Sequence, residues 1–282
     1  ICVQTAEKVF ITLSGENALE VSGAYDTKSL DSAIVSKQDL TLNGTGSLSV
    51  VSMQGNGITS KDDLKITGGA YRISAGADGL KANDSIRIYD GTIAIDAGKD
   101  ALHSENHQDD TLGYIYIQNG ELTLTAADDG IQGNAIVQID GGTLNIATCT
   151  EGIEGTYVQI NDGTIDIYAT DDGISVSQKS SCDMLMEING GAITIDMAAG
   201  DTDALDSNGD LYINGGTINI TAVSAFDYTG TGELNGGDVT VNGETVTVLT
   251  QSQMGFQMGG GGMGGGNMGG GGGGRGGGMP GK

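Results

Sequence analysis

Acidic residues that stand directly before a glycine recur along this chain, and they are its clearest candidates for chemistry. Asp128 and Asp129 precede Gly130, and the same doublet returns at Asp171 and Asp172. Single acidic residues occupy comparable positions at Asp78, Asp100 and Glu151. Carboxylate oxygens are the ligands that calcium prefers in proteins. The repetition indicates either a scaffold feature or a site that is built several times.

The acidic residues keep a fixed distance from a regularly spaced set of turn glycines. These glycines lie 21 to 29 residues apart, at Gly46, Gly69, Gly91, Gly120, Gly142, Gly163, Gly191, Gly216 and Gly237. Asp78, Asp100, Asp129, Glu151 and Asp172 each follow their own turn glycine by nine residues. Such self-similarity predicts one structural unit that is repeated along the chain.

Apolar residues alternate on both sides of the turn glycines. Around Gly91 they are Ile86, Ile88, Ile93 and Ile95, and similar sets surround Gly69, Gly142 and Gly216. Alternation with period two predicts two short strands joined by a tight turn. A third apolar position follows in most repeats, at Ile58, Leu80, Leu102, Ile131, Ile153, Ile174 and Leu205.

Three inward-facing strands per repeat describe a coil that can bury its apolar side only by stacking on its neighbours. The predicted fold is therefore an all-β, right-handed parallel β-helix, since parallel crossovers are nearly always right-handed. We expect about ten coils of about 22 residues between Val9 and Leu249. Residues 1–36 are predicted to form an irregular first coil, residues 37–249 the helix and residues 250–282 a flexible Gly/Met-rich tail. Two insertions, Glu105–Gly113 and Ser177–Met184, are predicted to leave the coil as loops.

In a stacked solenoid, equal offsets place these acidic residues in one column along the axis, and Asp203 and Asp227, a few positions later in their coils, are expected to extend it. Two carboxylates about 4.8 Å apart repel each other by roughly 3 kcal/mol at an effective dielectric constant near 20. Salt with nearby lysines, hydrogen bonds that cap backbone turns, or divalent cations could each relieve this repulsion. We favour calcium, and the predicted ligands are Asp78, Asp100, Asp128, Asp129, Glu151, Glu154, Asp171, Asp172, Asp201, Asp203, Asp206 and Asp227.

A second set of residues faces outward from the strand that precedes each turn. Basic, amide and aromatic side chains in a row suit an extended sugar chain, because tyrosine supplies both a stacking face and a hydrogen bond. The predicted carbohydrate-binding residues are Lys65, Arg87, Tyr114, Tyr116, Gln138, Tyr157, Gln159 and Tyr212. An ordinary solvated sheet face is the alternative interpretation. His103 and His107, at the first insertion, are interpreted as solvated, with an acid–base or ligand role as the alternative.

Composition limits the possible partners. The chain carries 37 acidic and 12 basic residues, for a formal charge of -25, which argues against nucleic-acid binding. Its three cysteines show no metal-ligand spacing, and no apolar run is long enough to span a membrane. The sequence opens on Ile1, and we expect that an export signal has been trimmed and that the protein acts outside the cell or at its surface.

Two segments carry a resemblance to a known family. "DDGIQGNAIVQIDGGTLNIATCTEGIEGT" and "YVQINDGTIDIYATDDGIS" resemble the repeats of a carbohydrate-binding β-helix family of clostridia and related bacteria. The resemblance implies an extracellular protein that binds calcium and plant cell-wall polysaccharides, including cellulose and acidic pectic chains such as polygalacturonate, without cleaving them. The acidic doublets of the family map onto Asp128, Asp129, Asp171 and Asp172, and less cleanly onto Glu151, Asp203 and Asp227.

Other functions remain open on sequence alone, because the same fold serves unrelated activities. A pectate lyase-like enzyme needs an arginine base beside calcium, and the candidates outside the tail are Arg72 and Arg87. A glycoside-cleaving enzyme needs two carboxylates at a defined separation. A purely structural surface spacer or adhesin, rigidified by calcium, is the third possibility.

Overall fold

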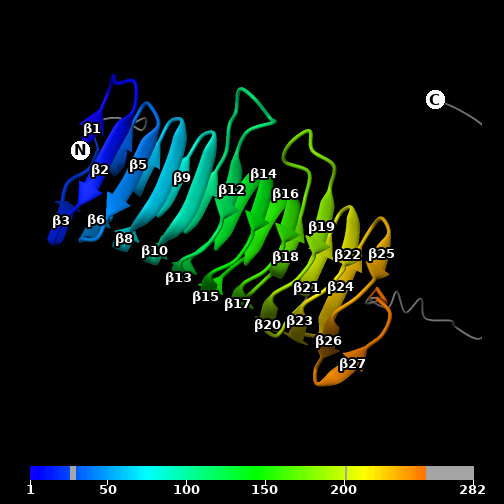
Figure 1. The fold of residues 1–282 in the computed structure, drawn as a ribbon. Coiled ribbons are helices and arrows are strands. Elements are labelled where there is room, and N and C mark those ends of the chain that lie inside the picture. The colour runs from blue at the N-terminus through cyan, green and yellow to red at the C-terminus, as the bar shows by residue number, and fades with distance from the viewer. Residues whose placement is uncertain (26–29, 201, 252–282) are drawn as a thin grey trace, which may run out of the picture. The chain divides into compact units, whose positions relative to one another are not determined.

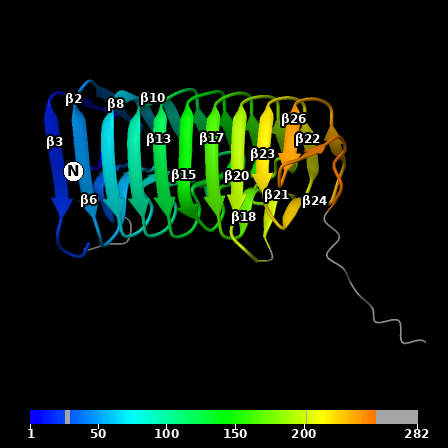
Figure 2. The ribbon, with the colours of Figure 1, turned by 90° about the horizontal axis from the view of Figure 1, so that it is seen from below.

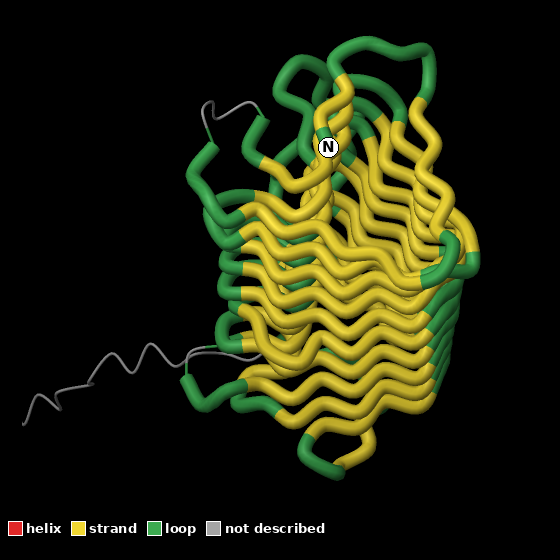
Figure 3. The backbone as a smooth tube through the Cα atoms, turned by 90° about the vertical axis from the view of Figure 1, so that its left-hand side faces the viewer, coloured by secondary structure: helices red, strands yellow, loops and turns green. Residues whose placement is uncertain are grey.

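The computed structural model describes residues 1–25, 30–200 and 202–251, and every regular element within them is a β-strand (Figure 1). Most strands pair in parallel with a strand one coil away rather than with the next strand in sequence. For example, β13 (Glu121–Ala126) pairs with β15 (Thr143–Cys149), which pairs in turn with β17 (Thr164–Ala169). The chain therefore winds as a parallel β-helix, as the repeat predicted, and Figure 3 shows its strands stacked layer on layer.

Three ladders of parallel strands run along the helix. Ladder A contains the strands that precede the turn glycines: β2 (Val9–Leu13), β5 (Leu40–Gly44), the first parts of β8 (Asp63–Ala75) and β10 (Ser85–Ala97), β12 (Tyr114–Ile117), the last parts of β14 (Ile131–Ile139) and β16 (Ile153–Ile160), β19 (Leu185–Ile188), β22 (Asp210–Ile213) and β25 (Gly232–Leu234).

Ladder B follows the turn glycines, and Figure 2 shows its strands side by side. It contains β3 (Glu16–Val21), β6 (Ser47–Ser52), the last parts of β8 and β10, β13, β15, β17, β20 (Ala192–Met197), β23 (Thr217–Thr221) and β26 (Asp238–Val241). Here β27 (Glu244–Val246) pairs with β26 in the antiparallel direction, which the repeat did not predict.

Ladder C completes each coil and carries the third apolar position. It contains β1 (Cys2–Val3), β4 (Ser32–Ser36), β7 (Asn56–Ser60), β9 (Leu80–Ala82), β11 (Leu102–Ser104), the first parts of β14 and β16, β18 (Asp172–Val176), β21 (Asp203–Ser207) and β24 (Ser224–Tyr228).

The apolar residues that alternate in the sequence form the buried core between the ladders. Ile115 and Ile117 of ladder A, Leu124 of ladder B and Ile131 of ladder C are all fully buried. Each such side chain contributes about 1.5–3 kcal/mol on leaving water. Because every coil repeats the same inward positions, the core is continuous along the axis and fixes the register of the outward residues.

Two kinds of glycine hold the coils at this spacing. Gly142, a turn glycine, has a φ of 93°, in the left-handed region that side chains avoid. Gly130, which follows the acidic doublet, has no such φ, but a Cβ there would lie 2.6 Å from the carbonyl oxygen of Gly152 in the next coil. The glycine of the acid–glycine motif is therefore required by the close approach of two backbones.

Both predicted insertions are loops at the same corner, between ladder C and ladder A (Figure 1). One follows β11 and ends at β12, and the other follows β18 and ends at β19. The predicted tail lies outside the described residues from position 252 onward. No helix in the described part of the chain is long and apolar enough to cross a membrane.

Candidate functional site

The predicted acidic column exists, and it lies at the corner where ladder C begins. In each coil the backbone N–H that follows the acidic residue donates to the carbonyl oxygen of the acidic residue in the next coil. These bonds run from Gly79 N to Asp100 O, from Ala101 N to Asp129 O and from Gly130 N to Glu151 O. We call this line the acidic edge. Its first row is Asn56, Asp78, Asp100, Asp129, Glu151, Asp172, Asp203 and Ser224.

Several first-row side chains also cap the next coil. Asp129 N–H donates to Asp100 Oδ1 at 3.1 Å, and Asp203 N–H donates to Asp172 Oδ1 at 3.2 Å. Asn56 Oδ1 accepts in the same way from Asp78 N–H, at 3.0 Å. Turn capping therefore uses one carboxylate oxygen of Asp100 and one of Asp172, and the second oxygen of each can contact a different partner.

A second row runs parallel to the first, three residues further along each coil. Strand register aligns its members as Thr59, Lys81, His103, Gln132, Glu154, Ser175, Asp206 and Asp227. Asp227 was predicted to stand in the column of Asp203. The register instead pairs it with Asp206 and places Ser224 beside Asp203, because the coils near the C-terminus differ in length.

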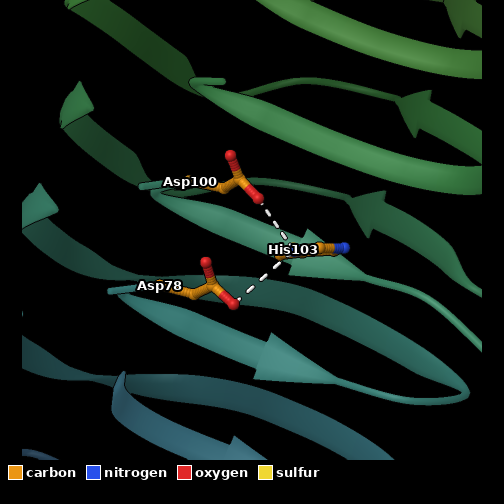
Figure 4. A group of neighbouring side chains, drawn as sticks. All are labelled: Asp78, Asp100 and His103. Carbon is orange, nitrogen blue, oxygen red and sulfur yellow. Dashed lines mark ion pairs between the residues drawn. The ribbon is translucent and has the colours of Figure 1, made fainter. Parts of the chain in front are cut away.

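At its N-terminal end the acidic edge is neutralised by the protein's own cations (Figure 4). Lys81 Nζ lies 2.5 Å from Asp78 Oδ2, and His103 Nδ1 lies 2.7 Å from Asp100 Oδ2 and 3.5 Å from Asp78 Oδ2. Burial opposes ionisation of Asp78, but His103 and Lys81 outweigh it and lower the pKa of Asp78 to about 2. Burial likewise disfavours the charged imidazole, but Asp100 and Asp78 raise the pKa of His103 to about 9.

The side chain of His103 is only 12% exposed, so its interpretation as a solvated histidine was wrong. His107, with 81% of its side chain exposed, agrees with that interpretation. The difference arises because His103 occupies the second row of the acidic edge, whereas His107 lies in the loop beyond β11.

In the middle of the acidic edge, carboxylates crowd together with one loop cation. Oxygens of Asp129, Glu151 and Glu154 lie within 4.8 Å of one another. Lys179, from the second inserted loop, contacts Glu154 Oε2 at 2.8 Å, and Gln132 donates to both Asp129 and Glu154. Burial and the neighbouring carboxylates raise the pKa values of Asp129 and Glu151. Burial also opposes ionisation of Glu154, but hydrogen bonds from Lys179 and Gln132 outweigh it and lower its pKa.

Towards the C-terminus the acidic edge has no cation in its second row. Asp172 and Asp203 are adjacent in the first row, as are Asp206 and Asp227 in the second. Burial, followed by the charge of Asp206, raises the pKa of Asp172 to about 7. Burial and the charge of Asp227 raise the pKa of Asp206 to about 6. Asp171 is exposed beside this group, and Asp201 lies outside the described residues.

The middle of the acidic edge suits an oxygen-binding dication. Glu151 Oε2 is buried and has no hydrogen-bond partner among the described residues, which is costly unless a cation or water serves it. Asp128 extends the donor set, because its oxygen lies within 4.8 Å of those of Asp100 and Asp129. Calcium takes six to eight oxygen ligands, partly from water, so these clusters fit its chemistry.

Tyrosines gather on the outward face of ladder A. They line a groove of about 370 Å³ whose walls are Arg87, Tyr89, Tyr114, Tyr116, Ile136 and Gln138. Tyr89 and Tyr116 meet edge to face, with ring centroids 5.9 Å apart. Arg87 lies over the ring of Tyr114, 5.0 Å from its centroid, and Lys65 lies 5.2 Å from the centroid of Tyr89. Sheet register puts Lys65, Arg87, Tyr116 and Gln138 in one line along the axis.

Tyr89 was not among the predicted carbohydrate-binding residues. It falls where the pairing of β8 with β10 shifts by one residue, between Ile88 and Asp90. The side chain of Tyr89 still follows the alternation, because Ile88 is buried whereas Arg87 and Tyr89 are partly exposed. Its position, two residues before the turn glycine Gly91, holds polar residues such as Asp140, Asn161 and Asn189 in other coils, so the repeat did not mark it as aromatic.

The other predicted carbohydrate-binding residues lie outside this groove. Tyr157 and Gln159 both donate to Glu187, so their polar groups already have partners. Tyr212 donates to Asp210 at 3.3 Å. The predicted stripe is a continuous row in register. A second hollow of about 210 Å³ lies on the N-terminal side of the groove and reaches from Lys65 to the exposed Phe10.

Comparison with family models identifies the family to which the chain belongs. A family model described as a carbohydrate-binding domain-containing protein matches residues 1–201 and 150–267, so the chain belongs to that family. Among solved structures, the chain is similar to a polysaccharide lyase-like protein from C. thermocellum, determined as a gadolinium derivative. The identity is 17%, the match covers 84% of this chain and 94% of that one, and the TM-score is 0.38. The chain matches none of the curated proteins with which it was compared.

Proposed function

We propose that the protein binds plant cell-wall polysaccharide outside the cell without cleaving it, and that calcium occupies part of the acidic edge. The proposed ligands are acidic pectic chains such as polygalacturonate, and cellulose. One observation carries the proposal: a member of a carbohydrate-binding family presents a tyrosine-lined groove with a lysine and an arginine along its axis.

The groove supplies the contacts that a sugar chain needs. Tyr114 and Tyr116 offer aromatic surface for the apolar faces of sugar rings, and their hydroxyl groups offer hydrogen bonds. Lys65 and Arg87 offer positive charge to a uronate carboxylate, and arginine can bind such a group through two parallel hydrogen bonds. Because these residues follow one another along the axis, we expect the polysaccharide to lie parallel to the stack of coils.

Calcium would reconcile a strongly acidic protein with an acidic ligand. Asp129, Glu151 and Glu154 would hold an ion through oxygen atoms, and Asp172 with Asp206 would contribute in the next coils. A bound ion lowers the negative charge of the protein and so weakens its repulsion of an acidic sugar chain in the groove. The same ions would also stabilise the stack by relieving repulsion along the acidic edge.

A matched pair of tyrosine variants tests the groove. Tyr116 and Tyr212 occupy the same outward row of ladder A and each donates to an aspartate, but only Tyr116 lines the groove. We expect Tyr116→Ala to weaken polygalacturonate binding about tenfold in isothermal titration, whereas Tyr212→Ala should leave it unchanged. Equal affinities for the two variants would exclude this groove as the binding site.

Two controls separate the alternative functions. A lyase would generate unsaturated sugar products and a glycosidase new reducing ends, so incubation with polygalacturonate and calcium should yield neither. Arg87, one of the two candidate lyase bases, pairs with Asp63 on ladder A, and Arg72 is exposed on ladder B.

A structural spacer would bind neither insoluble cellulose nor pectin in a pull-down. Repeating the titration with a chelator shows whether calcium takes part in recognition or only in folding.

A further inference from the structure

His103 and the two aspartates beside it differ in donor chemistry from the rest of the acidic edge. The clusters further along combine carboxylates only, whereas Asp78, Asp100 and His103 bring one imidazole nitrogen and two carboxylates within 4.8 Å of one another. Imidazole together with carboxylate suits zinc and similar transition metals, while calcium prefers oxygen donors alone.

The separations fit a small ion. Ligand atoms at about 2.0–2.2 Å from a tetrahedral zinc ion lie roughly 3.4 Å apart. Here His103 Nδ1 is 2.7 Å from Asp100 Oδ2 and 3.5 Å from Asp78 Oδ2, so small side-chain movements would bring the three atoms around one centre. Figure 4 shows both carboxylates facing the same ring nitrogen from adjacent coils.

Without an ion, the polar atoms of this group are incompletely served. Asp78 is 1% exposed, yet its Oδ1 has no hydrogen-bond partner in the described part of the chain. The short contacts of His103 are ion pairs without a well-aligned hydrogen bond, since neither ring nitrogen has one among residues 1–25, 30–200 and 202–251. One N–H cannot be directed at two carboxylates at once, whereas a metal ion can be shared between them.

The second ring nitrogen of His103 faces a carboxylate. Metal-binding histidines usually donate this N–H to a carboxylate, a backbone carbonyl or water. His103 Nε2 lies 3.6 Å from Glu105 Oε2, and Asn134 donates to the other oxygen of Glu105 at 3.0 Å. A carboxylate in this position orients the imidazole and raises its basicity as a ligand. Glu105 belongs to the first inserted loop, so the loop supplies the support for the ring.

From these observations we propose that Asp78, Asp100 and His103 form a binding site for a transition-metal dication of the zinc class, which shares Asp100 with the neighbouring carboxylate cluster and differs from it in its nitrogen ligand. A bound dication can replace the two cations that neutralise the aspartates without changing the net charge of the group. A dication brings two positive charges, as many as Lys81 and the protonated imidazole supply together. The ring gives up its proton on binding, and the partly exposed Lys81 turns towards solvent.

Zinc titration of the full chain tests the proposal. Protein stripped with a chelator and kept in excess calcium is titrated with Zn²⁺ against a chromogenic zinc chelator, with the thiols kept reduced. We expect one tight zinc ion per chain. His103→Gln should weaken its binding at least a hundredfold, and Glu105→Gln should weaken it about 10- to 100-fold. The matched control is His107→Gln, which removes the chain's only other histidine. Because His107 Nδ1 lies 3.4 Å from Glu105 Oε1 but 81% of the His107 side chain is exposed, this change should alter zinc affinity far less than Glu105→Gln does.

Each outcome has a defined meaning. The proposal is overturned if the unmodified chain binds no zinc, if calcium displaces the zinc, or if His103→Gln titrates like the unmodified chain. Calcium-induced thermal stabilisation and polygalacturonate affinity are measured on the same variants, to show that they are folded. A zinc result of either sign therefore leaves the proposed sugar-binding function to be judged by its own experiment. Absorption bands of Co²⁺ in place of Zn²⁺ would report the nitrogen ligand directly.

Discussion

The two ends of the acidic edge occupy equivalent positions in the repeat, but the repulsion between their stacked carboxylates is relieved in different ways. Around Asp78 and Asp100 the chain supplies Lys81 and His103, and the carboxylates are held ionised. Around Asp172 and Asp206 it supplies no cation in the second row, and burial with repulsion raises the carboxyl pKa values. The comparison teaches that the repeat dictates where charges stand, whereas single substitutions in the second row decide what neutralises them.

The largest expected effect comes from removing one carboxylate at each of two positions. In a chelating buffer, Asp78→Asn should destabilise the protein by about 3 kcal/mol, because Lys81 loses its partner and the buried His103 keeps only one of its two carboxylates. Glu151→Gln should instead raise the melting temperature by about 2–4 °C, because it removes a buried carboxylate repelled by its neighbours. Thermal unfolding followed by circular dichroism measures both. Shifts of the same sign would show that the two regions are not electrostatically different.

The second largest expected effect is the gain in thermal stability when calcium is added, which should depend on the middle of the acidic edge. An ion present at a hundred times its dissociation constant stabilises the folded state by about 2.7 kcal/mol per site, or roughly 5–10 °C here. We expect the unmodified chain to gain this stability and Glu151→Gln to lose most of the gain. Asp96→Asn, an acid-to-amide change on the outward face of ladder B, serves as the matched control and should gain as the unmodified chain does. A gain that survives Glu151→Gln unchanged would place the ion elsewhere.

The pH dependence of the metal-free protein completes the comparison. Asp172 and Asp206 have pKa values of about 7 and 6, above the ordinary value of 3.8, so the folded state favours their protonated forms. Their contribution to stability is fully present below about pH 4 and is lost as the pH rises through 6 to 7. The melting temperature in chelator should therefore fall between pH 5 and pH 8. With calcium present this trend should reverse, because the ion binds the ionised carboxylates. A metal-free melting temperature that rises over this range would contradict the repulsion inferred at Asp172.

The repeat predicted most of the fold, because its apolar alternation is local and regular. Leu64, Ile131 and Ile153 are buried as expected, and the two insertions leave the coil where they were expected to. Strand β27 lies within residues 37–249, which were predicted to form the helix, but it folds back on β26 in the antiparallel direction instead of adding a parallel strand. The handedness of the helix stays a prediction.

The candidate site was predicted less completely, because it depends on register between coils of unequal length. The first row of the acidic edge from Asp78 to Asp172 followed from a constant offset, but Asp227 moved to the second row. The burial of His103 was not predicted. It depends on Asp78 and Asp100, which two successive coils bring next to the ring, and the sequence around His103 alone does not reveal this contact. Tyr89 was missed because the equivalent position in several other coils holds Asp or Asn, as at Asp140 and Asn161.

The shared position of the two inserted loops has a consequence for engineering. Coils of different length stay in step because the extra residues bulge out at one corner, after β11 and after β18, while the ladders on either side continue. That corner is a natural splice point. A foreign peptide grafted there would be displayed at a known height on the rod, next to the acidic edge, without disturbing the spacing of the coils beneath it.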